Sequence, residues 1–464
     1  MCNVSLNGTQ PTDASIRVLR ALEAAGLEAW YVGGWVRDAL MGRPSHDVDM
    51  CCSGPWQESK AALEAADIAV VESGIKFGGI TAIYDGERIE VTTYRLDGFY
   101  TDGRHPQSVE RAASLEDDLA RRDFTVNAMA WHPERGLVDR YDGQGDLKRK
   151  LIRAVGDPKR RFNEDALRML RAVRFACRLD FMIEPRTKQA LAECAPLLDA
   201  VARERVGIEL EGILSTGHGG DAMLRYPELV CAAVPELASA RGFDQRSVYH
   251  AFNVYEHIAR VLTVAGELAL CDGVAPSSSL MWAAFLHDVS KPECFTVDHD
   301  GSGHFYGHPE LGAKKARVIM DRLALSHDLV RDVCLLIKYH DKPLRPERSC
   351  LLNMMRALSG EGVDTPRLID ELMDLKRADT LGKAPSCFYY VETIEEMRTL
   401  AHDLLQAGEP YTLKMLAING GDLIRAGVKP GPELGQLLNA ALDAAIEDNI
   451  PNNREALLTH LHLG

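Results

Sequence analysis

The sequence lacks any apolar run approaching the roughly 20 residues that a membrane-spanning helix needs, although 46% of its 464 residues are hydrophobic. Its N-terminus lacks the basic segment and apolar stretch of a secretory signal. Internal repeats and low-complexity segments are also missing. These absences favour a cytoplasmic protein with no membrane partner. Since one hydrophobic core stops growing at roughly 250–300 residues, we expect several packed units.

The eleven cysteines include no C-x-x-C pair. Cys51 and Cys52 are adjacent, so their side chains would point to opposite faces of an extended segment. Cysteines scattered in this way are typical of reduced packing thiols rather than of disulfides or a structural zinc site.

Positive charge is scarce, with 53 Lys and Arg against 68 Asp and Glu and a formal net charge of -15. Taken alone, this balance argues against a nucleic-acid partner, because phosphate contacts need clustered cations. The segment 148–178 is an exception, with eleven Lys and Arg and three acidic residues. The segment is either the place of an anionic substrate or a solvated helix face.

The chain changes character near residue 150. Before it, β-rich runs such as Ile80–Tyr84 and Arg88–Tyr94 mix with short helical patches and Gly-rich turns, which predicts an α/β unit. After it, apolar residues recur at spacings of three and four, which predicts helices to the C-terminus. The predicted fold class is α+β, an α/β head followed by an all-α neck, body and tail. Polar and Gly/Pro-rich joints place the parts at 1–150, 151–240, 241–384 and 385–464.

Two motifs in the head carry residues suited to phosphate chemistry. Gly33 and Gly34 join an apolar run to a helical pattern, so the backbone there can approach an anion, although a plain turn is the alternative. Asp47 and Asp49 alternate in a strand-like run, which places both carboxylates on one face. Carboxylates this close suit Mg²⁺ between them, with a solvated strand edge as the alternative. Glu90, in a further β-rich run, could supply a third carboxylate.

Polar residues recur at a spacing of three within 164–178, namely Asp165, Arg168, Arg171 and Arg174. The spacing predicts one helix with a packing face and a polar face. A carboxylate beside a guanidinium offers an acceptor and a planar set of donors, which can match the edge of a nucleobase. An ordinary surface pair on a helix is the alternative.

The motif GG-x-VRD-x-L-x-G at 33–42, followed by D-x-D at 47–49, resembles the head domain of the class II nucleotidyltransferases. That family includes tRNA CCA-adding enzymes and bacterial poly(A) polymerases. The similarity continues through TDGRHP at 101–106, RRDFTVNAM at 121–129 and EDALR at 164–168, and it ends with ERVGIE at 204–209.

The resemblance implies a site for Mg²⁺ and an incoming nucleotide. Asp47 and Asp49 would hold the magnesium ion, with Glu90 as the further catalytic carboxylate. Asp165 and Arg168 match the motif that reads CTP or ATP by the Watson–Crick edge. The other implied nucleotide contacts are Gly33, Gly34, Arg37, Arg122, Arg171 and Arg174.

The helical half contains a separate set of His and Asp residues, in the order H…HD…H…H…D. Imidazole and carboxylate together suit a divalent metal with open coordination positions. The order resembles the HD phosphohydrolase superfamily, which implies a metal of unspecified identity and hydrolysis of phosphate esters. A scaffold that holds no metal is the alternative. The implied core ligands are His257, His287, Asp288 and Asp379, with His308 and His340 as neighbours.

The stretch 418–438 is a structural turn by composition, but it resembles the C-terminal segment of HD-bearing CCA-adding enzymes, which implies contact with tRNA. Together the resemblances predict an enzyme that builds or repairs the 3′-terminal CCA of tRNA from CTP and ATP and releases pyrophosphate. The loop at 104–109 and the EDxxR motif favour full CCA addition. Three alternatives stay open: a poly(A) polymerase or an enzyme adding only CC or only A, an HD phosphohydrolase with an RNA-binding head, and a non-catalytic RNA-binding scaffold.

Overall fold

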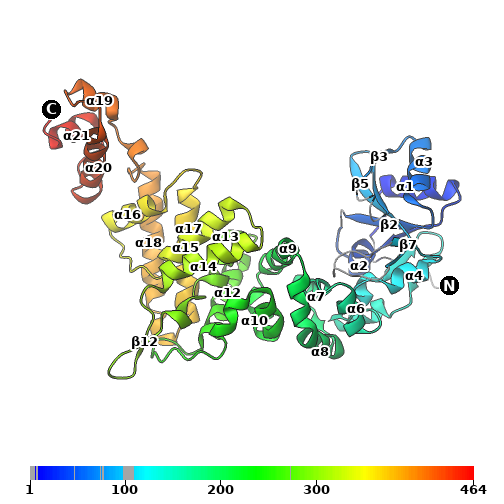
Figure 1. Cartoon of the computed structure of the whole chain (residues 1–464). Coiled ribbons are helices and arrows are strands. Elements are labelled where there is room, and N and C mark those ends of the chain that lie inside the picture. The colour runs from blue at the N-terminus through cyan, green and yellow to red at the C-terminus, as the bar shows by residue number, and fades with distance from the viewer. Residues whose placement is uncertain are drawn as a thin grey trace. The chain divides into compact units, whose positions relative to one another are not determined.

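The computed structural model describes residues 6, 9–45, 47–73, 75, 78–97, 109–271 and 273–463. The chain divides into two units, Met1–Leu210 and Glu211–Gly464 (Figure 1). A mixed sheet lies in the first unit and helices dominate the second, so the predicted α+β class is confirmed. Within the described part of the chain, every helix is too short or too polar to cross a membrane.

The first unit is built around a seven-stranded sheet with the order β3-β4-β5-β2-β1-β8-β9. Neighbouring strands are antiparallel except β2 and β5, which run parallel at the centre. The two β-rich runs predicted from the sequence form β4 and β5. The strands are β1 (Ala29–Val32), β2 (Val48–Cys52), β3 (Ala69–Val71), β4 (Gly79–Tyr84), β5 (Glu87–Thr93), β8 (Met129–His132) and β9 (Gly136–Asp139). A separate antiparallel pair joins β6 (Arg95–Asp97) to β7 (Val109–Arg111).

Two apolar clusters cover the faces of this sheet. Cys51 packs in one with Trp30 and Val32, whereas Cys52 packs in the other with Tyr31. Because successive residues of a strand face opposite sides, adjacent cysteines enter different clusters, as the sequence predicted. Both cysteines are buried and neither forms a disulfide.

Short helices surround the sheet and continue into the neck. Their bounds are α1 (Asp13–Ala24), α2 (Gly34–Leu40), α3 (Trp56–Ala65), α4 (Leu115–Ala120), α5 (Gly143–Arg149), α6 (Pro158–Glu164), α7 (Arg168–Leu179), α8 (Pro185–Cys194) and α9 (Arg203–Leu214). A parallel pair of β10 (Leu151–Ile152) and β11 (Met182–Ile183) interrupts the neck, which the sequence had predicted to be all helical.

The prediction of a single helix through Asp165 is wrong, because α6 ends at Glu164 and α7 begins only at Arg168. Asp165 has extended backbone angles, φ -145 and ψ 105, and ends α6. Its Oδ1 atom accepts a hydrogen bond from the Leu167 backbone N–H at 3.0 Å. A short polar side chain that bonds to nearby backbone in this way competes with helix continuation. Asp165 therefore lies at a bend and Arg168 begins the next helix.

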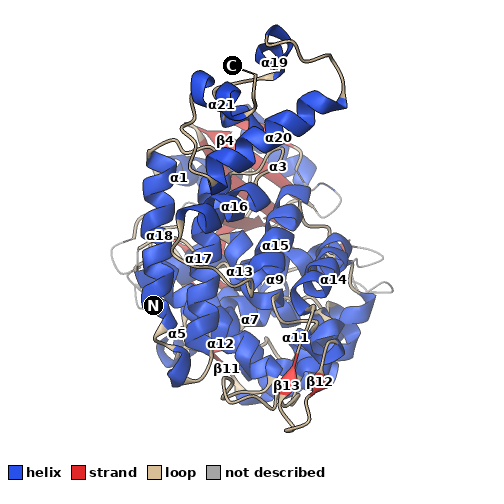
Figure 2. Cartoon of the chain, turned by 90° about the vertical axis from the view of Figure 1, so that its left-hand side faces the viewer, coloured by secondary structure: helices blue, strands red, loops and turns tan. Residues whose placement is uncertain are grey.

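The second unit is a bundle of helices, in which β12 (Thr296–Val297) and β13 (Gly303–His304) form a short hairpin among the described residues (Figure 2). Helix α13 packs against α12, α15 and α17, and its apolar sequence is buried along almost its whole length. The helices are α10 (Gly219–Arg225), α11 (Pro227–Ala233), α12 (Val254–Cys271), α13 (Ser278–Leu286), α14 (His308–Arg322), α15 (His327–Tyr339), α16 (Arg348–Leu358), α17 (Thr365–Gly382), α18 (Tyr390–Gln406), α19 (Gly420–Arg425), α20 (Pro432–Glu447) and α21 (Arg454–His460).

Candidate active site and metal centre

A cleft of about 470 Å³ opens in the first unit where the central strands meet the neck. Acidic side chains from the sheet and basic side chains from 121–122 and α7 line it together. Such a mixture fits a ligand that carries both metal-bound phosphate and a polar base. The charged lining residues are Asp49, Glu90, Arg95, Arg121, Arg122, Asp123, Asp165, Arg168, Arg171 and Arg205.

The parallel pairing of β2 and β5 brings two carboxylates together. Asp49 and Glu90 are register partners, so their side chains lie on one face of the sheet. The sequence suggested Glu90 as a third carboxylate, and the register places it beside Asp49. Burial, together with the negative charges of Asp47 and Glu90, raises the pKa of Asp49 to about 6. The carboxylates therefore repel one another, and a cation would relieve the repulsion.

Gly33 joins the first motif to this carboxylate pair. Its φ of +68 lies in the left-handed region that disfavours residues with a Cβ atom. A Cβ atom there would lie 3.1 Å from Nη1 of Arg122 and 3.5 Å from Oδ2 of Asp49. The glycine turn, the D-x-D motif and the RRDF motif thus meet at one point of the head.

Two aspartates, the buried Asp118 and the half-buried Asp123, orient the arginines of the cleft, and sequence reasoning missed both. Asp118 forms ion pairs with Arg121 at 2.7 Å and with Arg122 at 3.0 Å. Asp123 accepts two hydrogen bonds from Arg171, from Nε at 3.0 Å and from Nη2 at 2.7 Å. Burial opposes the charge of each carboxylate, but the neighbouring guanidinium groups outweigh it and lower both pKa values. The run of acidic and basic residues at 116–123 was the available signal.

The residues implied in base reading lie together, with different partners from those the spacing suggested. Asp165 forms an ion pair with Arg205, in which Nη2 of Arg205 lies 3.1 Å from Oδ2 of Asp165. Arg168 donates from Nη1 to Glu164 at 3.0 Å and from Nη2 to the Arg121 carbonyl at 3.1 Å. Since Asp165 and Arg168 both line the cleft, it is provided with an acceptor and a donor at one place. Arg205 was missed, although it lies in the ERVGIE motif.

Two other arginines predicted to contact the nucleotide, Arg37 and Arg174, instead bind side chains of the protein itself. Arg37 is buried, donates to Asp38 and Asn127, and lies 5.4 Å from the ring centre of Phe175. Arg174 donates to Glu209 at 2.6 Å. The structure thus places Asp49, Glu90, Arg122, Asp165, Arg168 and Arg171 in the lining, but not Gly33, Gly34, Arg37, Asp47 or Arg174. The predicted loop at 104–109 falls outside the described residues up to position 108.

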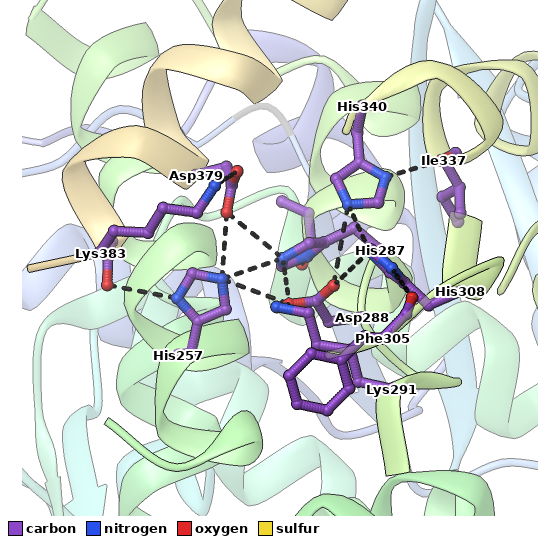
Figure 3. A network of polar contacts seen from close by, with 12 residues as sticks. His257, His287, Asp288, Lys291, Phe305, His308, Ile337, His340, Asp379 and Lys383 are labelled. Atoms are coloured by element: carbon purple, nitrogen blue, oxygen red, sulfur yellow. Dashed lines mark hydrogen bonds and ion pairs between the residues drawn. The ribbon is translucent and has the colours of Figure 1, made fainter. Parts of the chain in front are cut away.

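The second cluster lies among the helices of the second unit, where four histidines surround Asp288 (Figure 3). His257 lies in α12 and Asp379 in α17, while His287 and His340 end α13 and α15 and His308 begins α14. Two groups of three residues could each hold a metal ion, because their ligand atoms lie within 4.8 Å of one another. The first group is His257, His287 and Asp288, and the second is Asp288, His308 and His340. The head carboxylates form no such group among the described residues.

Each histidine ring is oriented by a backbone carbonyl. The Nδ1 atoms lie 3.2 Å from the Gly382 oxygen for His257, 2.9 Å from Ala284 for His287, 2.7 Å from Phe305 for His308 and 2.7 Å from Ile337 for His340. A carbonyl only accepts, so Nδ1 carries the proton, and in the neutral ring Nε2 is the atom available to bind a metal. All four Nε2 atoms face Asp288, with His257 and His287 at 3.3 and 3.2 Å from Oδ2 and His308 and His340 at 3.4 and 3.7 Å from Oδ1.

Two lysines contact the carboxylates of this cluster. Lys291 lies 2.7 Å from Asp288, and Lys383 lies 2.6 Å from Asp379. Burial opposes the charge of both carboxylates, but the neighbouring cations and histidines hold their pKa values well below the usual range. Asp379 approaches His257 at 3.1 Å but belongs to neither close group, whereas His308 and His340 belong to one. The predicted neighbours are therefore as well placed to bind metal as the predicted core.

Four protein families match successive parts of the chain. They are the poly A polymerase head domain at 29–153, the "Probable RNA and SrmB-binding site of polymerase A" at 180–240, the HD domain at 254–383 and the tRNA nucleotidyltransferase domain 2 at 382–461. The CCA-adding enzyme of Streptococcus mutans is 32% identical over 447 residues, which cover 96% of this chain and 95% of the relative. That of Lactobacillus delbrueckii is 31% identical over 465 residues and covers 99% and 100%.

Solved structures agree with these matches. The crystal structure of the Bacillus stearothermophilus CCA-adding enzyme in complex with CTP has a TM-score of 0.70 at 25% identity and covers 98% of each chain. The Thermotoga maritima CCA-adding enzyme complexed with tRNA shares the fold, with a TM-score of 0.60 at 21% identity over 100% of this chain and 98% of that one.

The sheet, its cleft and the matching head domain define a nucleotidyltransferase that also carries an HD domain. The chain belongs to the CCA-adding enzyme family.

Proposed function

We propose that this protein adds or repairs the 3′-terminal CCA of tRNA, using CTP and ATP and releasing pyrophosphate. The observation that carries the proposal is the single cleft in which Asp49 and Glu90 face Asp165, Arg168 and Arg171. A phosphate-binding metal site and a base-reading pair within one cavity are what template-independent nucleotide addition requires.

Asp47 and Asp49 are proposed to hold Mg²⁺, with Glu90 as the third carboxylate. The oxygen donors fit a hard divalent cation, and such a cation would offset both the burial of the Asp49 charge and its repulsion by Asp47 and Glu90, which together raise the pKa of Asp49. When bound, the metal lowers the pKa of the attacking ribose hydroxyl and neutralises the phosphates. The chain's own residues position the substrate: Asp165 and Arg168 bind the base, and Arg171 contacts the nucleotide.

The remaining nucleotide contacts are proposed to act from around the cleft. Gly33 and Gly34 allow close approach of the backbone, and Arg122 is aimed at this point by Asp118. Arg37 and Arg174 are held by Asp38 and Glu209 and are proposed to supply positive potential to the phosphates. In the proposed division of labour, the head spans 1–150, the nucleotide- and RNA-binding neck 151–240, the HD domain 241–384 and the tRNA-binding tail 385–464.

The test uses tRNA transcripts that end before CCA, after C and after CC. Each is incubated with the protein and Mg²⁺, with CTP and ATP supplied singly and together, and the products are sized at single-nucleotide resolution. Growth that stops at CCA on all three transcripts is expected. Unlimited growth with ATP alone would instead indicate a poly(A) polymerase, and activity confined to CC or to the final A would indicate a split enzyme.

A second function is favoured by the histidine cluster, which we propose is a divalent metal centre for hydrolysis of phosphate esters. The four Nε2 lone pairs around a charged carboxylate fit a divalent metal, and Asp288 offers one oxygen to each group of ligands. The proposed ligands are His257, His287, Asp288 and Asp379, joined by His308 and His340. Metal content measured after dialysis, together with phosphate release from nucleotides, tests this proposal in full-length protein.

A further inference from the structure

Two aromatic rings are stacked at the cleft beside the histidine cluster. The rings of His304 and Tyr306 have centroids 5.3 Å apart and planes that differ by 5°. Both side chains line the cleft, which has a volume of about 310 Å³. The Tyr306 side chain is 74% exposed, so most of its surface is available to a ligand.

The segment that carries this stack is fixed in place. His304 Nε2 lies 2.6 Å from Oδ2 of Asp298, across the β12–β13 hairpin. The Gly303 N–H donates to the Arg246 carbonyl at 2.9 Å, and a Cβ atom at this glycine would lie only 2.3 Å from the Gln245 carbonyl oxygen. Since the backbone is held so closely, the stack exists before any ligand binds, which lowers the entropy cost of binding.

Packing does not account for Tyr306. The intervening Phe305 packs on Phe295, with ring centroids 5.5 Å apart, and lies 5.2 Å from the Lys291 ammonium (Figure 3). Phe305 is half-buried and also lines the cleft, whereas the Tyr306 ring is exposed and no aromatic partner other than His304 is seen for it among the described residues. An aromatic residue exposed in a cleft, and not needed for the core, is suited to binding a flat ligand.

The rest of the cleft is suited to a phosphate. Lys291, Lys383 and His250 line it together with His308, His340 and Asp379. Lys291 donates to Gln245 at 3.1 Å and Lys383 pairs with Asp379, so both ammonium groups are fixed. The cavity volume lies at the lower end of the range for small-ligand sites, which fits one nucleotide rather than a large molecule.

We propose that Tyr306, supported by His304, is the nucleobase platform of this cleft, and that the ligand is a ribonucleoside phosphate ester. The base stacks on the exposed side of the Tyr306 ring, and the phosphate lies at the lysines and the histidine cluster. The inference rests on the proposed second function, because it names the residue that would bind the base of a nucleotide substrate in the same cleft. The ester is either a free mononucleotide or the terminal nucleotide of an RNA, since the chemistry recognised is the same.

The test measures equilibrium binding to the full-length protein by calorimetry. The probes are adenosine monophosphate, ribose 5-phosphate and a short RNA with a 3′-terminal phosphate. The variants are Tyr306→Ala and Tyr306→Phe, with Tyr389→Ala as the matched control, since Tyr389 is 77% exposed but does not line the cleft. Binding to the head cleft is common to all the proteins and cancels in the comparison.

Tyr306→Ala is expected to weaken binding of a base-bearing probe by on the order of tenfold or more, the size of base–aromatic stacking. Binding of ribose 5-phosphate stays unchanged, and Tyr306→Phe and Tyr389→Ala behave as the wild type. Dependence seen with adenosine monophosphate identifies a free nucleotide as the source, and dependence confined to the RNA identifies an RNA end. Equal loss for base-bearing and base-free probes, or no loss for either base-bearing probe, overturns the inference.

Phosphate release is followed separately in the same samples. A Tyr306-dependent preference for base-bearing ligands without phosphate release would mean that the hydrolytic function fails while the platform stands. Phosphate release that is insensitive to the base and to Tyr306 would mean the reverse.

Discussion

Arg205 and Asp165, which both line the head cleft, form an ion pair across 40 residues of sequence, with Nη2 3.1 Å from Oδ2. The second carboxylate oxygen of Asp165 accepts the Leu167 N–H, so both oxygens are engaged and the carboxylate has one orientation. Arg205 is therefore a positioning residue for the acceptor that the proposed function assigns to the base.

Removing the Arg205 guanidinium is expected to relax the choice of nucleotide. With Arg205→Ala the Asp165 carboxylate can rotate, and a lost hydrogen bond to a charged group costs about 1.5–3 kcal/mol. We expect the preference for CTP and ATP over UTP and GTP to fall by roughly tenfold or more, and Arg205→Lys to restore part of it. Single-nucleotide incorporation on tRNA, measured with each of the four nucleotides, checks this.

The matched control is Arg203→Ala. Arg203 lies two residues before Arg205 in the same helix, and it is not part of the cleft lining. Its guanidinium forms an ion pair with Asp199 at 3.0 Å. Arg203→Ala should leave the preference unchanged. If Arg205→Ala slowed all four nucleotides equally, Arg205 would have a purely structural role.

Asp49→Asn is expected to abolish nucleotide addition and to stabilise the fold. Because burial and the neighbouring carboxylates raise the pKa of Asp49 to about 6, its ionised form is disfavoured in the folded state. The asparagine should raise the free energy of unfolding at pH 8 by about 1–2 kcal/mol in the absence of metal, solvent screening part of the repulsion.

The sign of this effect sets its pH dependence. A carboxyl whose folded pKa is raised destabilises the fold fully above that pKa, and the cost disappears as pH falls through about 6 toward the unfolded value. Denaturant unfolding of both proteins at pH 8 and pH 4 should therefore show a gap that closes at pH 4. A gap of the same size at both values would show that the stabilisation has another origin.

Gly33→Ala is expected to impair activity beyond its effect on stability. The new methyl group would meet Arg122 at 3.1 Å and Asp49 at 3.5 Å. Gly26→Ala supplies the control, because Gly26 has a similar φ of +79 but no atom within 4 Å of the added Cβ. Both variants should lose about 1 kcal/mol of stability through the positive φ. Only Gly33→Ala should lose nucleotide addition, and equal activity losses in primer-extension assays would argue against the contact.

The head motifs were predictable because their chemistry is local, whereas their partners were not. The alternation of Asp47 and Asp49 and the β-rich run around Glu90 could be seen in the sequence, but the parallel register that joins Asp49 to Glu90 depends on sheet topology. Arg205 was missed because its partner is 40 residues away. Helical spacing gave the wrong result at Asp165, where a side-chain hydrogen bond to the backbone ends the helix.

The histidine cluster around Asp288 illustrates the same limit. Residue types and order predicted the cluster, including His308 and His340. They did not predict that each oxygen of Asp288 would face its own pair of imidazoles. The tautomers also depend on carbonyl groups that periodicity does not reveal, such as Gly382 opposite His257. Sequence patterns identify which chemistry is present, and the folded chain decides which atoms meet.

Two substitutions should separate the two sites. Asp47 is a proposed Mg²⁺ ligand, so Asp47→Ala should abolish nucleotide addition. Because Asp47 is exposed, the substitution should not affect the fold or the metal content of the HD domain. His287 is fully buried among the proposed metal ligands of the HD domain, so His287→Ala should lose HD-bound metal and phosphate release while CCA addition continues. His287→Gln keeps more of the buried volume and serves as the second variant if the alanine protein unfolds. Metal analysis, phosphate release and tRNA extension are measured on each protein, and loss of both activities in either folded variant would contradict two independent sites.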